Sequence, residues 1–116
     1  MMNWDRVRDD GRMIIGGDRD RFLSVRFYYS RGTGFGDRGY YLSVTPVRRV
    51  SRVGYSFLEC CPSDGKRVFL KSVSRRSAKT DKEAGAIVDM VLDGLINDVC
   101  VKNGIDRADL GELIAG

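Results

Sequence analysis

The sequence predicts a single α+β domain: an antiparallel β-meander of four to five strands with one long C-terminal helix packed on one face, followed by a short terminal helix. Two patterns predict this class. Apolar and polar residues alternate in several runs between residues 13 and 73, whereas residues 81–103 carry apolar residues at spacings of three and four. A chain of 116 residues, 42% of them hydrophobic, can enclose one core, so residues 1–116 are expected to form one domain.

The first hairpin is predicted from two alternating runs, residues 21–29 and residues 40–47, which a long glycine-rich loop connects. A shorter apolar run at residues 13–15 predicts one more strand before them. Pro46 cannot donate a ladder hydrogen bond, so the strand that contains it is expected to end there or to lie at an edge of the sheet.

A second hairpin is predicted from the runs at residues 55–61 and 66–73. Between them lies the sequence Pro-Ser-Asp-Gly. Pro62 fixes φ for a turn, and Gly65 can take the left-handed conformation that a tight return needs. The two runs are therefore expected to pair with each other.

The long helix is predicted to begin after Thr80, whose hydroxyl and the side chain of Glu83 have the spacing of a capping box. It is predicted to end before Gly104, which suits a left-handed cap. Its apolar stripe needs a sheet to cover it and consists of Ala84, Ile87, Val88, Val91, Leu92, Leu95, Ile96 and Val99. Asp106 is expected to cap a short terminal helix that reaches Ile114.

The composition argues against enzymatic chemistry, because the chain has no histidine to act as a general base or metal ligand. Cys60 and Cys61 should point to opposite faces of a strand, and Cys100 lies on the helix, so we expect free thiols and no metal or cofactor. The protein is expected not to be an enzyme. Carboxylate chemistry at Asp18 and Asp20 remains an alternative, although aspartates in turns are more often caps or solvated.

Charge divides the chain into a basic and an acidic part. Residues 1–80 hold 17 Lys and Arg against 8 Asp and Glu, whereas residues 81–116 hold 3 against 8. If the sheet is cationic and the helix anionic, the field favours an anionic partner at the sheet. The alternative is that these charges are ordinary solvated surface.

The face of the sheet opposite the helix is predicted to be aromatic and basic. Aromatic rings can stack on unpaired bases, and arginine can contact phosphate bidentately. The residues expected to bind nucleic acid or a partner are Phe22, Arg26, Tyr28, Arg31, Arg38, Tyr41, Arg48, Arg49, Arg52, Arg75 and Arg76. The glycine-rich loop after Arg31 lies between strands and lacks the helix dipole of phosphate-binding loops, so it is either a mobile contact loop or an ordinary hairpin loop.

Two segments, residues 21–27 and residues 38–47, resemble stretches of small accessory proteins from bacterial mobile elements and phages. The resemblance implies nucleic-acid binding or obstruction of a host defence machine such as a CRISPR effector. The order of strands followed by a helix is also similar to the Whirly and coactivator type of single-stranded-DNA binder, which works as an oligomer.

Two functions follow as hypotheses. In the first, the protein is a non-enzymatic module that binds single-stranded nucleic acid through the basic, aromatic face. In the alternative, it is an anti-CRISPR-like inhibitor that binds a host nucleic-acid-processing complex through protein contacts. A homodimer is expected, because Phe22, Tyr28 and Tyr41 would otherwise form an exposed patch. With no transmembrane run and no signal-like N-terminus, a cytoplasmic location is expected and no membrane partner.

Overall fold

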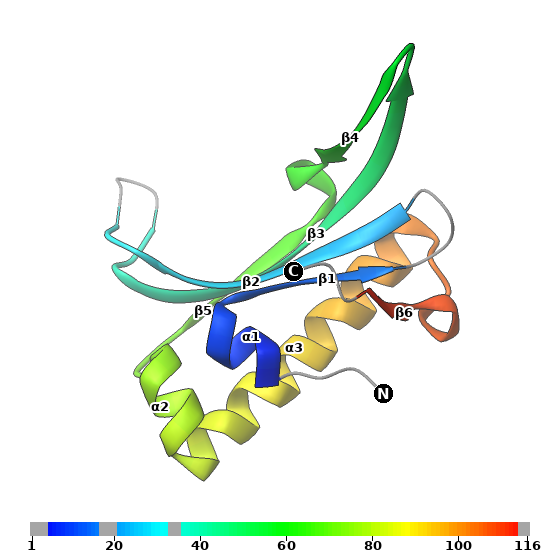
Figure 1. The fold of residues 1–116 in the computed structure, drawn as a ribbon. Coiled ribbons are helices and arrows are strands. Elements are labelled where there is room, and N and C mark those ends of the chain that lie inside the picture. The colour runs from blue at the N-terminus through cyan, green and yellow to red at the C-terminus, as the bar shows by residue number, and fades with distance from the viewer. Residues whose placement is uncertain (1–4, 17–20, 33–35, 114–116) are drawn as a thin grey trace.

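The computed structural model describes residues 5–16, 21–32 and 36–113 and confirms the predicted α+β class, with an antiparallel sheet and helices on one side of it (Figure 1). The strands are β1 (Arg12–Gly16), β2 (Arg21–Ser30), β3 (Gly39–Arg52), β4 (Tyr55–Cys60), β5 (Lys66–Leu70) and β6 (Gly111–Leu113). The helices are α1 (Asp5–Asp10), α2 (Arg75–Thr80) and α3 (Lys82–Asn103), with the 3-10 turns η1 (Pro62–Asp64) and η2 (Arg107–Asp109).

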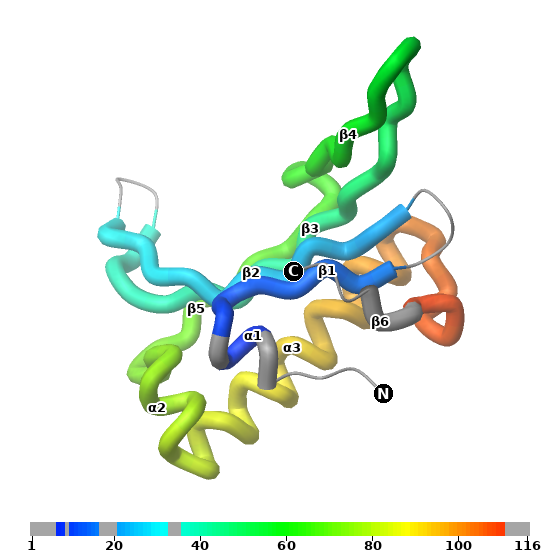
Figure 2. Tube along the Cα trace, viewed as in Figure 1, coloured from blue at the N-terminus to red at the C-terminus, as the bar shows by residue number. Residues whose placement is uncertain are grey.

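The sheet has the strand order β4-β3-β2-β1-β6, and β5 also pairs with β3. The predicted first hairpin is confirmed, since β2 and β3 pair from Arg21 opposite Arg48 to Ser30 opposite Gly39. The end of β3 and the whole of β4 extend away from the helices (Figure 2). We call this hairpin, residues 47–60, the arm.

Pro46 lies inside β3, so the prediction that its strand ends there or forms an edge is wrong. The backbone carbonyl of Pro46 accepts a hydrogen bond from the N–H of Cys61 (2.9 Å). In an antiparallel strand the N–H and C=O of one residue point to the same neighbour. The nitrogen of Pro46, which has no hydrogen to donate, therefore faces the junction between β4 and β5. The regular strand pairing is interrupted there, so no ladder hydrogen bond is lost.

The predicted second hairpin is also wrong, because β4 and β5 pair with β3 one after the other rather than with each other. β4 pairs with residues 47–52 and β5 with residues 40–44. Gly65, between them, has a φ of −95° and is not left-handed. Glycine is needed here because the backbone at residue 65 passes close to β3: a Cβ on Gly65 would lie 2.6 Å from the carbonyl oxygen of Val44. A glycine with positive φ does lie in the preceding turn, that of the arm, namely Gly54 (φ 86°).

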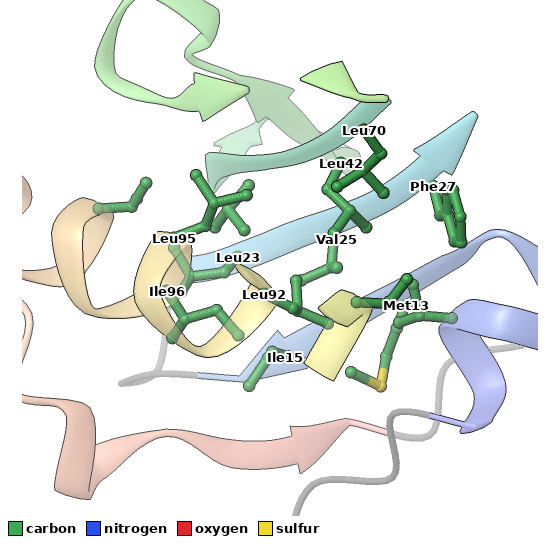
Figure 3. Close-up of a cluster of buried hydrophobic side chains, with 14 of the residues drawn as sticks. Met13, Ile15, Leu23, Val25, Phe27, Leu42, Leu70, Leu92, Leu95 and Ile96 are labelled. Carbon is green, nitrogen blue, oxygen red and sulfur yellow. The ribbon is translucent and has the colours of Figure 1, made fainter. Parts of the chain in front are cut away.

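The core lies between the sheet and α3, and Figure 3 shows its side chains interleaving. Leu23 and Val25 of β2 are fully buried, as are Leu92 and Ile96 of α3. Burying each such side chain stabilises the fold by about 1.5–3 kcal/mol. The rest of this buried cluster consists of Val7, Met13, Ile15, Phe27, Leu42, Val44, Leu70, Val73, Ala78, Ala84, Val88, Leu95, Val99, Cys100 and Ile105.

The predicted capping box at Thr80 and Glu83 is wrong. Thr80 ends α2, and its hydroxyl donates a hydrogen bond to the carbonyl oxygen of Arg76 (2.9 Å). Asp81 caps α3 instead, and its carboxylate accepts from the backbone N–H of Glu83 (2.9 Å). The other end agrees with the prediction, because Gly104 is the left-handed cap with a φ of 65°.

Two helices were not expected from the sequence. α2 begins with a reciprocal capping box between Ser74 and Ser77, a pattern without the usual Glu or Gln. α1 has only six residues, too few to display an apolar stripe. None of the described helices is both long enough and apolar enough to cross a membrane.

The terminal helix is shorter than predicted. Asp106 does cap it, and its carboxylate accepts from the N–H of Ala108 (3.0 Å), but the helix is the single 3-10 turn η2. The following residues form β6, which pairs with β1. Ile114 lies outside the described residues, as do Asp18 and Asp20.

Candidate nucleic-acid interface

The open face of the sheet, opposite the helices, carries three arginines in one line across four strands. Arg12 of β1 lies opposite Arg26 of β2, Arg26 lies opposite Ser43 of β3, and Ser43 lies opposite Arg67 of β5. Neighbouring strands are about 4.8 Å apart, so Arg12 and Arg26 are one such spacing apart and Arg26 and Arg67 two, and all three guanidinium groups can contact one extended anion. We call Arg12, Arg26 and Arg67 the arginine row; all three are exposed.

A parallel line of aromatic residues runs beside the arginine row. Tyr28 of β2 lies opposite Tyr41 of β3, which lies opposite Phe69 of β5. The guanidinium of Arg26 lies 4.8 Å from the ring centre of Tyr28, and that of Arg67 lies 5.1 Å from the ring centre of Tyr41. These cation–π contacts keep the guanidinium groups of Arg26 and Arg67 close to the face.

The arginine row has no carboxylate partner among the described residues. Like charges directly opposite each other on neighbouring strands destabilise a sheet by a few tenths to about 1 kcal/mol. Arg12 and Arg26 are such a pair. Their arrangement therefore has an electrostatic cost that an anion bound between them would remove.

A shallow hollow of about 460 Å³ lies beside the row, at its Arg26 and Arg67 end. Ser24, Ser43 and Thr45 contribute hydroxyls to its lining. Hydroxyls can donate to a phosphate or to the edge of a base. The hollow thus adds uncharged hydrogen-bonding groups to the cationic row.

Two of the aromatic residues expected to be exposed are buried within the chain. Phe22 is 6% exposed and Tyr41 is 5% exposed, which corrects the prediction of an open aromatic patch. The guanidinium of Arg49 lies 5.5 Å from the ring centre of Phe22. The Tyr41 hydroxyl donates to the carbonyl oxygen of Asp37 (2.8 Å). Rings that the chain itself covers are not available to stack on bases.

The remaining predicted residues do not all share this face. Because strand residues alternate, Arg49 lies on the open face, while Arg48 and Arg52 lie on the other face of the arm. Arg48 is paired with Glu59 (2.9 Å), and the hydrogen bond and charge of that carboxylate raise the pKa of Arg48.

The predicted arginines outside the strands lie on two further elements. Arg31 and Arg38 are exposed in the glycine-rich loop, where Arg38 Nε donates to the carbonyl oxygen of Arg31 (3.4 Å). Arg75 and Arg76 are the first residues of α2, on the helix side of the sheet. Arg31, Arg38 and Arg76 do not extend the arginine row, whereas Arg75 lines a hollow of about 800 Å³ together with Arg12, Arg26 and Tyr28.

Sequence reasoning missed four residues. Arg12 was outside the predicted first strand, and Arg67 was placed on a strand but not recognised as a neighbour of Arg26, because that requires knowing that β5 pairs with β3. Tyr55 and Phe57 are exposed on the arm, and their rings stack 6.1 Å apart. Their period-two spacing was visible in the sequence.

The aspartates of α3 are neutralised one by one, in contrast to the arginine row. Asp89 pairs with Arg8 (3.1 Å), Asp98 pairs with Lys66 (2.6 Å), and Asp93 pairs with Arg107. Asp81 is engaged as the helix cap. The acidic third of the sequence therefore presents little unpaired negative charge on this helix.

The three cysteines are free thiols in different environments. Cys60 is exposed and Cys100 is buried, and burial raises the pKa of the Cys100 thiol. Within the described ranges, no three carboxylate or thiol side chains are arranged to hold a metal ion.

Comparison of the chain with protein-family models, with curated proteins and with solved structures finds no match.

Proposed function

We propose that the protein is a non-enzymatic module that binds single-stranded nucleic acid on the open face of its sheet. The observation that carries this proposal is the arginine row: three exposed arginines in one line across β1, β2 and β5, with no carboxylate partner among the described residues. Arginine contacts phosphate bidentately, and an extended strand supplies a line of phosphates.

A single strand fits this face better than a duplex does. Duplex readers insert a helix or ribbon into a groove, whereas a sheet face offers a platform to unstacked bases. Guanidinium planes can also stack on bases, and Arg26 and Arg67 already lie against the rings of Tyr28 and Tyr41. A base could stack on the outer side of such a guanidinium, which lies over the tyrosine ring. Binding of this kind should depend little on the base sequence.

Fluorescence anisotropy with a labelled single-stranded oligonucleotide, at low and at moderate salt, tests the proposal. We expect binding at low salt that weakens as salt rises. Arg26→Gln should weaken binding several-fold, because it removes one phosphate contact. Arg48→Gln is the matched control: it removes the same charge from the other face of the arm, where Glu59 already pairs with it, and should change binding little. No binding at low salt with tens of micromolar protein would refute the proposal.

The second candidate function is inhibition of a host nucleic-acid-processing complex through protein contacts, as the resemblance to phage and mobile-element proteins implies. The arm favours this alternative. It carries exposed apolar side chains, which make no favourable contact with phosphate but can be buried against another protein. They are Val53, Tyr55, Phe57 and Leu58. Exposed tyrosine and arginine side chains are the usual anchors of protein interfaces. If the oligonucleotide fails to bind, a pull-down from host lysate with wild-type protein and Tyr55→Ala distinguishes a specific partner from none.

A further inference from the structure

The outer face of α3, turned away from the sheet, carries a second apolar stripe that the core does not use. Ile87 is 42% exposed, Met90 is 70% exposed and Val101 is 83% exposed. Together with Gly94 these residues follow the spacing of one helix face, i, i+3, i+7 and i+14. We call Ile87, Met90, Gly94 and Val101 the outer stripe.

Gly94 is the least expected residue of the outer stripe. Glycine in a helix interior is less favourable than alanine by up to about 1 kcal/mol, and its missing side chain permits a shorter distance between packed helices. In the described part of the chain nothing lies within 4 Å of the position that a Cβ on Gly94 would take. The space beside Gly94 is therefore open and leaves room for the backbone of another helix.

The charges beside the outer stripe are already compensated. Asp89 and Asp93 on one flank pair with Arg8 and Arg107, and Asp98 on the other flank pairs with Lys66. Two copies of this helix face can thus approach without the repulsion that unpaired aspartates would cause.

The outer stripe is also self-complementary. Ile87 and Val101 each lie seven residues, or two helical turns, from Gly94. If two α3 helices cross antiparallel at Gly94, Ile87 of each copy meets Val101 of the other, which is the reciprocity that a two-fold interface requires. The same arrangement places the acidic start of one helix, with the exposed Glu83, at the same end as the basic last turn of the other, with Lys102, whose ammonium also donates to the carbonyl oxygen of Ser63 (3.0 Å).

We propose that two copies of this chain form a two-fold dimer through their outer stripes, with antiparallel α3 helices that cross at Gly94. One helix pair buries less area than a standard-size interface, so the dissociation constant should be micromolar. The inference does not rest on nucleic-acid binding, because the open faces of the sheets lie on the opposite side of each copy. It replaces the expectation that a second copy covers Phe22, Tyr28 and Tyr41, because the chain itself buries Phe22 and Tyr41 and partly covers Tyr28.

Sedimentation velocity over a micromolar concentration series tests the dimer. We expect the wild type to pass from monomer to dimer and Met90→Asp to remain monomeric, with a dissociation constant raised at least tenfold. Val53→Asp is the matched control, since it places the same charge on an exposed apolar residue of the arm. A wild type that stays monomeric at high micromolar concentration overturns the proposal. So does a dimer that Val53→Asp abolishes and Met90→Asp leaves intact.

Disulfide trapping tests the antiparallel geometry. In a chain carrying Cys60→Ser and Cys61→Ser, Gly94→Cys should form a disulfide-linked dimer, because the two copies of this position face each other at the two-fold axis. Ile87→Cys should form the link only when mixed with Val101→Cys. Efficient linking of Ile87→Cys to itself would indicate parallel helices and contradict the proposal.

Discussion

The open face of the sheet and the outer face of α3 both carry several charged residues, yet they differ in what those charges contact. On the sheet, the guanidinium groups of Arg26 and Arg67 lie on aromatic rings and meet no carboxylate in the described chain. On α3, Asp89 and Asp93 each meet a cation from another element. The net charge of a segment therefore does not predict how it attracts a partner. The charged side chains that have no ion-pair partner within the chain determine that attraction.

The comparison assumes that only one face of the sheet is covered, and Leu92→Asp tests that assumption with the largest effect. Leu92 is fully buried between α3 and the sheet. An unpaired carboxylate there should lower the free energy of unfolding by about 4 kcal/mol or abolish folding. Met90→Asp, on the exposed side of the same helix, should leave the monomer stable. Circular dichroism during thermal unfolding measures both, and equal melting temperatures would contradict the packing.

Thiol labelling compares the same helix with the arm. Cys100 is buried on the inner side of α3, and burial raises its pKa, so less thiolate is present at pH 8 than for an ordinary thiol; Cys60 is exposed. We expect alkylation of Cys100 to be about a hundredfold slower, because it must wait for a local opening of about 3 kcal/mol. Mass spectrometry of the modified peptides follows each site. Comparable rates at the two cysteines would show that this end of α3 is not packed as described.

Replacing Asp81 or Thr80 by alanine shows which of the two residues caps α3. Asp81 accepts hydrogen bonds from two backbone N–H groups at the start of the helix. Its replacement should cost about 1 kcal/mol of stability. Thr80→Ala should cost less, since that hydroxyl only bonds back to the previous turn. Urea unfolding measures both free energies. A larger loss of stability in Thr80→Ala than in Asp81→Ala would contradict the cap seen in the structure and support the capping box expected from the sequence.

Removing one charge is expected to change the free energy of unfolding in opposite directions on α3 and on the open face of the sheet. Asp93→Asn removes the partner of Arg107 and should lower the free energy of unfolding by about 0.5 kcal/mol. Arg12→Gln relieves the repulsion with Arg26 across the strands and should leave stability equal or slightly higher. Urea unfolding at low salt resolves the two signs. A clear loss of stability in Arg12→Gln would mean that this arginine has a structural role.

The sequence was sufficient to predict the elements with strong periodicity and insufficient to predict their neighbours. The alternation that begins at Arg21 and the apolar spacing of α3 specify a strand and a helix locally, so both elements were predicted correctly. The stripe itself was wrong at Ile87, which was expected to face the sheet and is exposed. The partners of β4 and β5 depend on β3 being long enough to pair with both, and Pro46 suggested the opposite. α2 has a serine-based cap and six residues, which gives no pattern to detect.

The candidate site shows the same limit. Alternation correctly placed Arg26 and Tyr28 on the open face. The arginine row itself joins β1, β2 and β5, and no local pattern reveals that Arg12 and Arg67 lie on either side of Arg26. The burial of Phe22 and Tyr41 was also invisible, because it depends on arginines from neighbouring strands that lie over the rings.

If the arginines of the open face bind phosphates, as we propose, the affinity for a single-stranded oligonucleotide must depend on salt through these residues. Each phosphate engaged on a single strand contributes about 0.7 to the slope of log affinity against log salt. The combined variant Arg12→Gln, Arg26→Gln and Arg67→Gln should therefore reduce that slope by about 2. Its control removes three arginines that lie elsewhere, in Arg48→Gln, Arg52→Gln and Arg76→Gln, and should retain most of the slope. Equal losses in the two variants, or a slope that the open-face variant leaves unchanged, would contradict the proposal.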